Sequence, residues 1–179
     1  MTRPAFGKLM ALLPLAIALT QCDQVHAMLK PKPDAPSPYA FDLVLRMSPR
    51  AEAALKQPGK HLFVDAWYYG DATPAFHAQA DKLNRIFLGD ESWTYPGAAR
   101  RVHLRGAPMD TSKFSEIRGG QPQVLVDATQ QEGDPDNLVH CHAYTGSVRM
   151  AQQQVQVLNC EFDTEDYWEN AAASQGASD

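Results

Sequence analysis

The sequence lacks the short motifs by which common hydrolases and nucleotide-binding enzymes are identified. It has no Gly-x-Ser-x-Gly element, no His-Glu-x-x-His element and no phosphate-binding P-loop. Asp65 and Asp127 could be imagined as the carboxylate pair of a glycoside hydrolase. Each is instead expected to face water or to bond to neighbouring backbone. The sequence therefore predicts a protein that is not an enzyme.

Basic residues are also in short supply. The 16 Lys and Arg residues are outnumbered by 21 Asp and Glu residues, which gives a formal net charge of -5. A nucleic-acid-binding protein needs a basic surface to neutralise phosphates, so this class is excluded. An acidic surface instead favours a partner with a basic one.

Long apolar runs are absent after the N-terminus. Arg3 and Lys8 precede an apolar run over residues 9–20, and this arrangement is typical of an export signal. The run is too short for an ordinary transmembrane helix, which needs about 20 apolar residues. We therefore expect residues 1–27 to direct export and the rest of the chain to contain no membrane span.

Two processing sites compete within this signal. Leu19-Thr20-Gln21-Cys22 resembles the lipobox of bacterial lipoproteins, although that pattern has Gly, Ala or Ser where Gln21 stands. The resemblance implies lipid on Cys22 and a protein held at the periplasmic face of a bacterial membrane. The segment Val25-His26-Ala27 resembles an ordinary signal-peptidase site, which implies a soluble periplasmic protein beginning at Met28.

Cysteine is scarce, and the three cysteines fall into two groups, one in the N-terminal signal and two in the predicted folded domain. Cys22 is either acylated or removed, so an even pair remains, Cys141 and Cys160. If the strands around them form a hairpin that turns near residues 149–152, the two cysteines lie opposite each other. An oxidising compartment then favours a disulfide between them.

The remaining chain indicates a mainly β fold. Four prolines make residues 28–38 an extended spacer, residues 39–168 form the folded domain, and residues 169–179 form a flexible acidic tail. Seven strands are expected, over residues 39–47, 61–69, 84–88, 101–104, 123–128, 138–144 and 155–162. Two short helical connections are expected, over residues 48–56 and 108–118. This spacing predicts a single β-sandwich, immunoglobulin-like or transthyretin-like.

His140 and His142 are weak candidates for metal binding. In a strand they share one face, while Cys141 between them points to the other. Neither histidine could therefore act as a base for that cysteine. A zinc site needs a third ligand, and the sequence places none nearby. We accordingly predict no metal and no cofactor.

Aromatic residues supply the candidate partner-binding site. Trp93 and Tyr95 lie in a Gly- and Pro-bounded segment that is expected to be a loop, and Tyr69 ends an apolar strand. The sequence thus favours a non-enzymatic interaction protein of the bacterial envelope, for example an immunity-type inhibitor of a periplasmic toxin or hydrolase. A carbohydrate- or peptidoglycan-binding module is the second interpretation, and a small metal-binding or hydrolytic envelope enzyme is the third.

Overall fold

Alternation of apolar and polar side chains builds the strands of this fold. In β1 (Phe41–Met47), for example, Phe41, Leu43 and Leu45 are buried, whereas Arg46 is exposed. The computed structural model describes residues 37–97, 99–106, 109–130 and 138–176. The other strands are β2 (His61–Asp71), β3 (Arg85–Pro96), β4 (Arg101–Leu104), β5 (Gln123–Gln130), β6 (Val139–Cys141), β7 (Tyr144–Ser147) and β8 (Gln156–Phe162).

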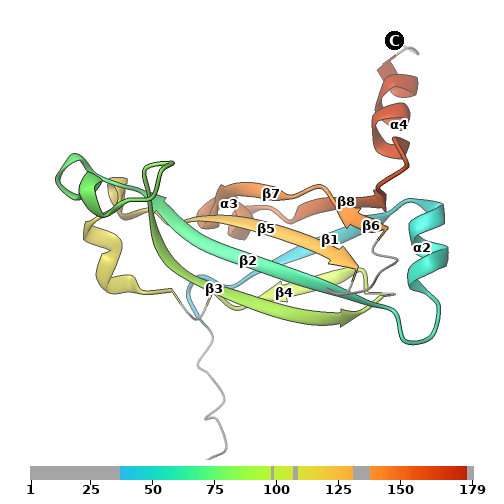
Figure 1. The fold of residues 1–179 in the computed structure, drawn as a ribbon, viewed down its shortest axis with the longest axis horizontal. Helices are drawn as coiled ribbons and strands as arrows, with labels where there is room; N and C mark the ends of the chain where they lie inside the picture. Colours follow the sequence, from blue (N-terminus) through green and yellow to red (C-terminus); the bar gives the residue numbers. More distant parts are fainter. Residues whose placement is uncertain (1–36, 98, 107–108, 131–137, 177–179) are drawn as a thin grey trace, which may run out of the picture. The chain divides into compact units, whose positions relative to one another are not determined.

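All eight strands belong to one sheet (Figure 1). The order is β3-β2-β5-β6-β8-β1-β4, with β7 also paired to β5. The predicted mainly β fold is confirmed. A β-sandwich needs two packed sheets and is not confirmed, because the strands of the described residues form one sheet. Strand alternation shows that one face is apolar; it does not show whether a second sheet or the curvature of the same sheet covers that face.

The sheet curves until it is nearly closed into a barrel. Its two edge strands, β3 and β4, approach each other, and the Tyr95 hydroxyl donates a hydrogen bond to the His103 carbonyl oxygen across the gap (3.0 Å). A bulge between Tyr68 and Tyr69 adds to the twist of the long β2–β3 pair. Gly89 of β3, opposite Tyr68, has φ 147°, a conformation that side-chain-bearing residues rarely adopt.

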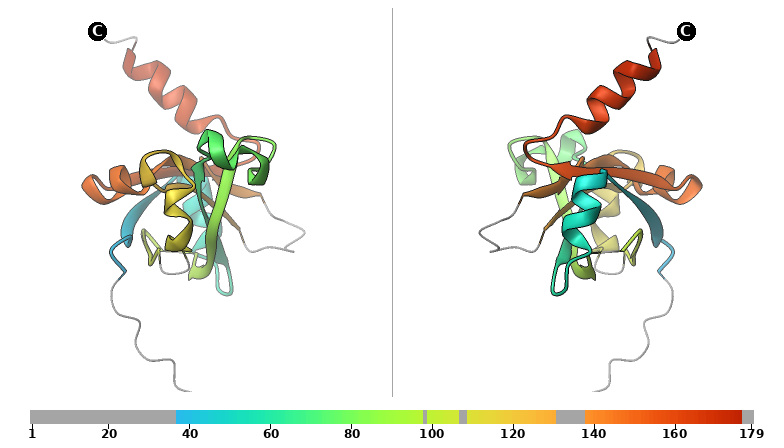
Figure 2. Two further views of the ribbon diagram at one scale, coloured as in Figure 1. Left: turned by 90° about the vertical axis from the view of Figure 1, so that its left-hand side faces the viewer. Right: turned by 90° about the vertical axis from the view of Figure 1, so that its right-hand side faces the viewer.

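Short helices cover the ends of this curved sheet. In α2 (Pro49–Leu55), the Ser48 hydroxyl caps the first turn by accepting from the Ala51 N–H (3.2 Å). Figure 2 shows α2 across one end of the barrel, where Leu55 is buried. The remaining helices are α3 (Val148–Gln153), α4 (Tyr167–Gly176) and the 3₁₀ helices η1 (Pro74–Gln79), η2 (Thr111–Ser115) and η3 (Arg118–Gly120).

Three elements of the structure differ from the elements that the sequence predicts. The expected loop after Asp90 continues as strand to Pro96, so β3 has 12 residues. In the described part of the expected helix over residues 108–118, the structure has the 3₁₀ helix η2 with Asp110 as its cap, and η3 begins at Arg118. Helix α4 occupies most of the segment that was predicted to be a tail.

The export signal, Cys22 and most of the spacer lie outside the described residues. Among residues 37–97, 99–106, 109–130 and 138–176, no helix is long and apolar enough to cross a membrane.

Candidate functional site

Two large aromatic side chains are exposed side by side on the outer face of β2 and β3. The Trp67 side chain is 54% exposed and that of Phe87 is 51% exposed. Their ring centroids lie 6.4 Å apart in an edge-to-face arrangement. Trp67 points outward because its neighbours Ala66 and Tyr68 point into the core, where both are fully buried.

Two hollows flank Trp67. The larger has a volume of about 430 Å³ and the smaller about 240 Å³. The larger is lined by Trp67, Tyr68, Tyr69, Asp81, Arg85, Phe87, Asp90 and Leu125. The smaller is lined by Asp65, Trp67, Leu125 and Asp127. We call Trp67, Phe87, Tyr69, Asp65 and Asp127, on β2, β3 and β5, the aromatic face.

The aromatic face is acidic. Asp65 and Asp127 are directly opposite each other in the β2–β5 register, and Asp90 is opposite Trp67 on the other side. Of the described residues that line the two hollows, Arg85 is the positively charged one. Its guanidinium forms an ion pair with Asp81 (2.9 Å). The carboxylates of the aromatic face are therefore left to attract positive charge from outside.

Arg85 and Asp81 also shape one wall of the larger hollow. Hydrogen bonds from the backbone N–H and the guanidinium of Arg85 hold the pKa of Asp81 below its usual value. The same guanidinium lies over the Tyr69 ring, 5.1 Å from its centroid. Tyr69, which the sequence analysis proposed as a partner-binding residue, thus lies in the candidate site.

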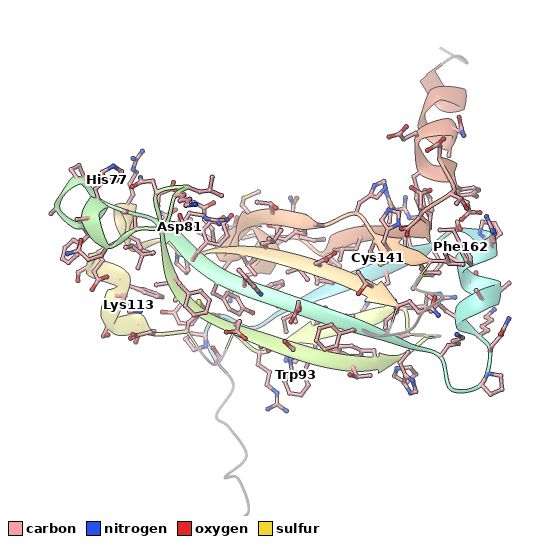
Figure 3. All side chains as sticks on the ribbon, in the orientation of Figure 1. His77, Asp81, Trp93, Lys113, Cys141 and Phe162 are labelled. Carbon is pink, nitrogen blue, oxygen red and sulfur yellow. A yellow bond between two sulfur atoms is a disulfide. The ribbon has the colours of Figure 1, made fainter. Side chains whose placement is uncertain are left out.

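The other two predicted partner-binding aromatics have structural contacts. Trp93 lies on β3 rather than in a loop (Figure 3), is half-buried, and donates from Nε1 to the Glu91 carboxylate (2.8 Å). The Arg105 guanidinium covers its ring at 4.6 Å. Tyr95 bonds across the gap between the edge strands. Gly89, which precedes this segment, belongs to the bulged β2–β3 strand pair.

The predicted disulfide between Cys141 and Cys160 is confirmed. The two cysteines are opposite each other in the antiparallel β6–β8 pair. The intervening chain is not a simple hairpin turn, because β7 and α3 lie between the two strands. Cys160 faces inward with Leu158, whereas Val157 is exposed.

His140 and His142, the weak metal-binding candidates of the sequence analysis, lie beside a third potential ligand, Glu161. His140, His142 and Glu161 each place one potential ligand atom within 4.8 Å of the others. The sequence did not indicate Glu161, because strand pairing alone brings it opposite His140.

Sequence reasoning also passed over Trp67 and Phe87. Both faces of the strand predicted over residues 61–69 are largely apolar, and this pattern favours a central strand that is covered on both sides. Asp65 within that alternating set was the available signal that this face meets solvent. Comparison of the chain with family models, with curated proteins and with solved structures finds no match.

Proposed function

We propose that this chain is a non-enzymatic binding module of the bacterial cell envelope, and that its aromatic face captures a protein with a basic surface. The observation that carries the proposal is the exposure of Trp67 and Phe87 at adjoining positions beside a hollow of about 430 Å³. Large aromatic side chains left in water are costly, and burial against a partner recovers that free energy.

The energetics of protein interfaces fit this arrangement. A few central residues carry most of the binding free energy, and Trp, Tyr and Arg are enriched among them. Trp67 is central here because it borders both hollows. Asp65 and Asp127 beside it would pair with Lys or Arg of the partner, which steers association and adds specificity.

The ring geometry favours a protein over a sugar. Carbohydrate-binding faces present flat aromatic surfaces on which pyranose rings stack. Trp67 and Phe87 meet at 77°, so they form a ridge rather than a platform. A ridge fits a pocket on a partner protein, as in the inhibitor of a toxin or hydrolase that the sequence analysis suggested.

The location is proposed on independent grounds. The disulfide Cys141–Cys160 is compatible with an oxidising compartment outside the cytoplasm. The N-terminal signal supplies the route, and lipid on Cys22 would hold the protein at the periplasmic face of a membrane.

Partner capture followed by reconstitution tests the proposal. The immobilised chain is exposed to envelope extract, the retained protein is purified, and its affinity is measured by calorimetry. Trp67→Ala should lower that affinity at least about tenfold, because hot-spot residues contribute about 2 kcal/mol or more. Asp65→Asn with Asp127→Asn should reduce the association rate and its dependence on salt.

A matched control separates binding from folding. Tyr167→Ala removes another exposed aromatic side chain, on α4, and should leave the affinity unchanged. Trp67→Ala should keep the midpoint of thermal unfolding within a few degrees, since a surface change costs roughly 0.5 kcal/mol or less. Unchanged affinity of Trp67→Ala would contradict the proposal. Retention of glycan instead of protein, lost in Trp67→Ala, would support the carbohydrate-binding alternative.

A further inference from the structure

We propose that His140, His142 and Glu161 form a binding site for a divalent transition metal, with Zn²⁺ as the ion of choice. One potential ligand atom from each residue lies within 4.8 Å of the other two. Two imidazoles and one carboxylate are a ligand set that zinc accepts, with a fourth position left open. This inference does not depend on the aromatic face, which lies on other strands.

The backbone presents these three ligands together. His140 is directly opposite Glu161 in the β6–β8 register. The His142 N–H continues the pairing by donating to the Asn159 carbonyl oxygen (2.7 Å). The three side chains therefore occupy neighbouring positions on one outward face of two bonded strands.

The disulfide makes that presentation rigid. Cys141 lies between the two histidines in sequence, and Cys160 lies next to Glu161. Their bond links the two strands from the opposite, inward face. Figure 3 shows Cys141 and Phe162 at the same end of the sheet. Little conformational entropy remains to be lost when the ligands close on an ion, which favours binding.

Glu161 needs positive charge. The residue is only 3% exposed, although it bears a carboxylate. Its Oε2 accepts from the Trp168 N–H (3.2 Å), and its Oε1 lies 3.0 Å from His142 Nε2. Burial of a carboxylate is costly unless hydrogen bonds and an opposite charge compensate, and a bound cation supplies that charge directly.

The surrounding polar atoms point to the same conclusion. Among the described residues, the buried side-chain atoms without a hydrogen bond are His140 Nδ1 and Asn159 Oδ1. Asn159 lies two positions before Glu161 on β8 and so shares its face. His140 Nδ1 is nevertheless within ion-pair distance of Asp163 Oδ1 (2.7 Å). Buried polar groups without a hydrogen bond are rare, and here Asn159 Oδ1 belongs to the strand that carries Glu161.

The ligand chemistry selects the class of ion. Imidazole nitrogen suits zinc and copper better than Ca²⁺ or Mg²⁺, which prefer oxygen ligands. No cysteine thiolate competes at this position, because Cys141 and Cys160 are bonded to each other. The His142 side chain is 46% exposed, so an ion has access from solvent.

Calorimetric titration with ZnCl₂ near pH 7.5 tests the site. The full, untagged chain is used after EDTA treatment, with Cys22→Ser to remove the cysteine outside the disulfide. We expect one Zn²⁺ per chain and a higher thermal midpoint when zinc is present. His142→Ala should lower the affinity about 100-fold or more, and Asp163→Asn, beside His140, about tenfold.

The fold offers a matched control at another surface. His103 forms a similar exposed pair with Asp42 (2.8 Å), and His103→Ala should leave zinc binding unchanged. Because Glu161→Gln could affect folding through its burial, the exposed His142 is the decisive ligand variant. Absence of stoichiometric zinc binding would overturn the proposal. So would equal affinity of His142→Ala and the parent chain, in which case the cluster is an ordinary histidine–carboxylate ion pair.

Discussion

Glu91 is a second side chain, beside Tyr95, that links the two edges of the sheet. It is 6% exposed, and its carboxylate accepts hydrogen bonds from the Tyr68 hydroxyl, from Trp93 Nε1 (2.8 Å) and from the backbone N–H groups of Arg105 (3.0 Å) and Gly106 (2.8 Å). Tyr68 and Trp93 belong to β2 and β3, whereas Arg105 and Gly106 follow β4. One buried carboxylate thus holds together strands that backbone pairing leaves apart, and these bonds to a charged acceptor are strong ones.

The same contact makes stability depend on alkaline pH. Burial raises the pKa of Tyr68 well above its usual value of 10.0, and the hydrogen bond and charge of Glu91 raise it further. Between pH 10 and the folded-state pKa, the unfolded tyrosine loses its proton while the folded one keeps it. The contribution is complete below about pH 10, and it decreases by about 1.4 kcal/mol per pH unit above that value.

Tyr68→Phe tests this dependence. At pH 7 the variant should lose about 1–2 kcal/mol of unfolding free energy, because Glu91 loses a hydrogen bond. Above pH 10 its stability should fall less steeply than that of the parent chain, as measured by urea unfolding at a series of pH values. Some decrease should remain, since burial also raises the pKa of Tyr95 and Tyr144. Parallel pH profiles for the two proteins would show that Tyr68 is not the responsible group.

At the scale of elements, β6 and β8 depend on a covalent link. Strand β6 has only three residues, and it pairs with β8 over three register positions. Short strands contribute few backbone hydrogen bonds, so the Cys141–Cys160 disulfide supplies much of the constraint on this pair.

Removal of the disulfide should therefore destabilise the fold. The cysteines are 19 positions apart, and a loop of that size is worth roughly 3 kcal/mol in the chain-entropy model. Cys141→Ala with Cys160→Ala should lower the denaturant midpoint accordingly, and a reducing agent should do the same to the parent chain. Cys22→Ala serves as the control and should match the parent. Equal midpoints with and without reductant would contradict the expectation.

At the scale of the whole molecule, anchoring is the property that sequence alone addresses. The apolar run over residues 9–20 that precedes Cys22, and the Pro-rich spacer over residues 28–38, predict a lipid-anchored protein on a tether. A single acyl chain binds a membrane only weakly. A processed lipoprotein is expected to be held firmly, as proteins with more than one acyl chain are.

Fractionation of cells tests this anchoring. The parent chain should remain with the membrane fraction, whereas Cys22→Ala should appear in the soluble periplasmic fraction. Mass spectrometry of the mature N-terminus provides the second measurement. A mature chain that begins at Met28 would exclude lipidation and would favour the signal-peptidase alternative.

Local patterns in the sequence determined most of the secondary structure. The period-two alternation of β1, β2 and β5 is visible in the chain because one face of each strand must be apolar. The start of α2 at Ser48-Pro49 also follows from nearby residues, and these features depend on backbone geometry within a few residues. The disulfide is instead predicted from the even pair, Cys141 and Cys160, that is left when Cys22 is set aside.

Only the tertiary structure decided which faces meet solvent and which distant residues meet one another. In the part of the chain that the structure describes, curvature of a single sheet covers the apolar faces. Trp67 is therefore exposed, while Trp93 is half-buried against the gap between the edge strands. Strand pairing over 19 residues or more brings Glu161 to His142 and Asp65 to Asp127. Such contacts depend on register between strands far apart in the chain, and the amino-acid sequence carries no local signal for that register.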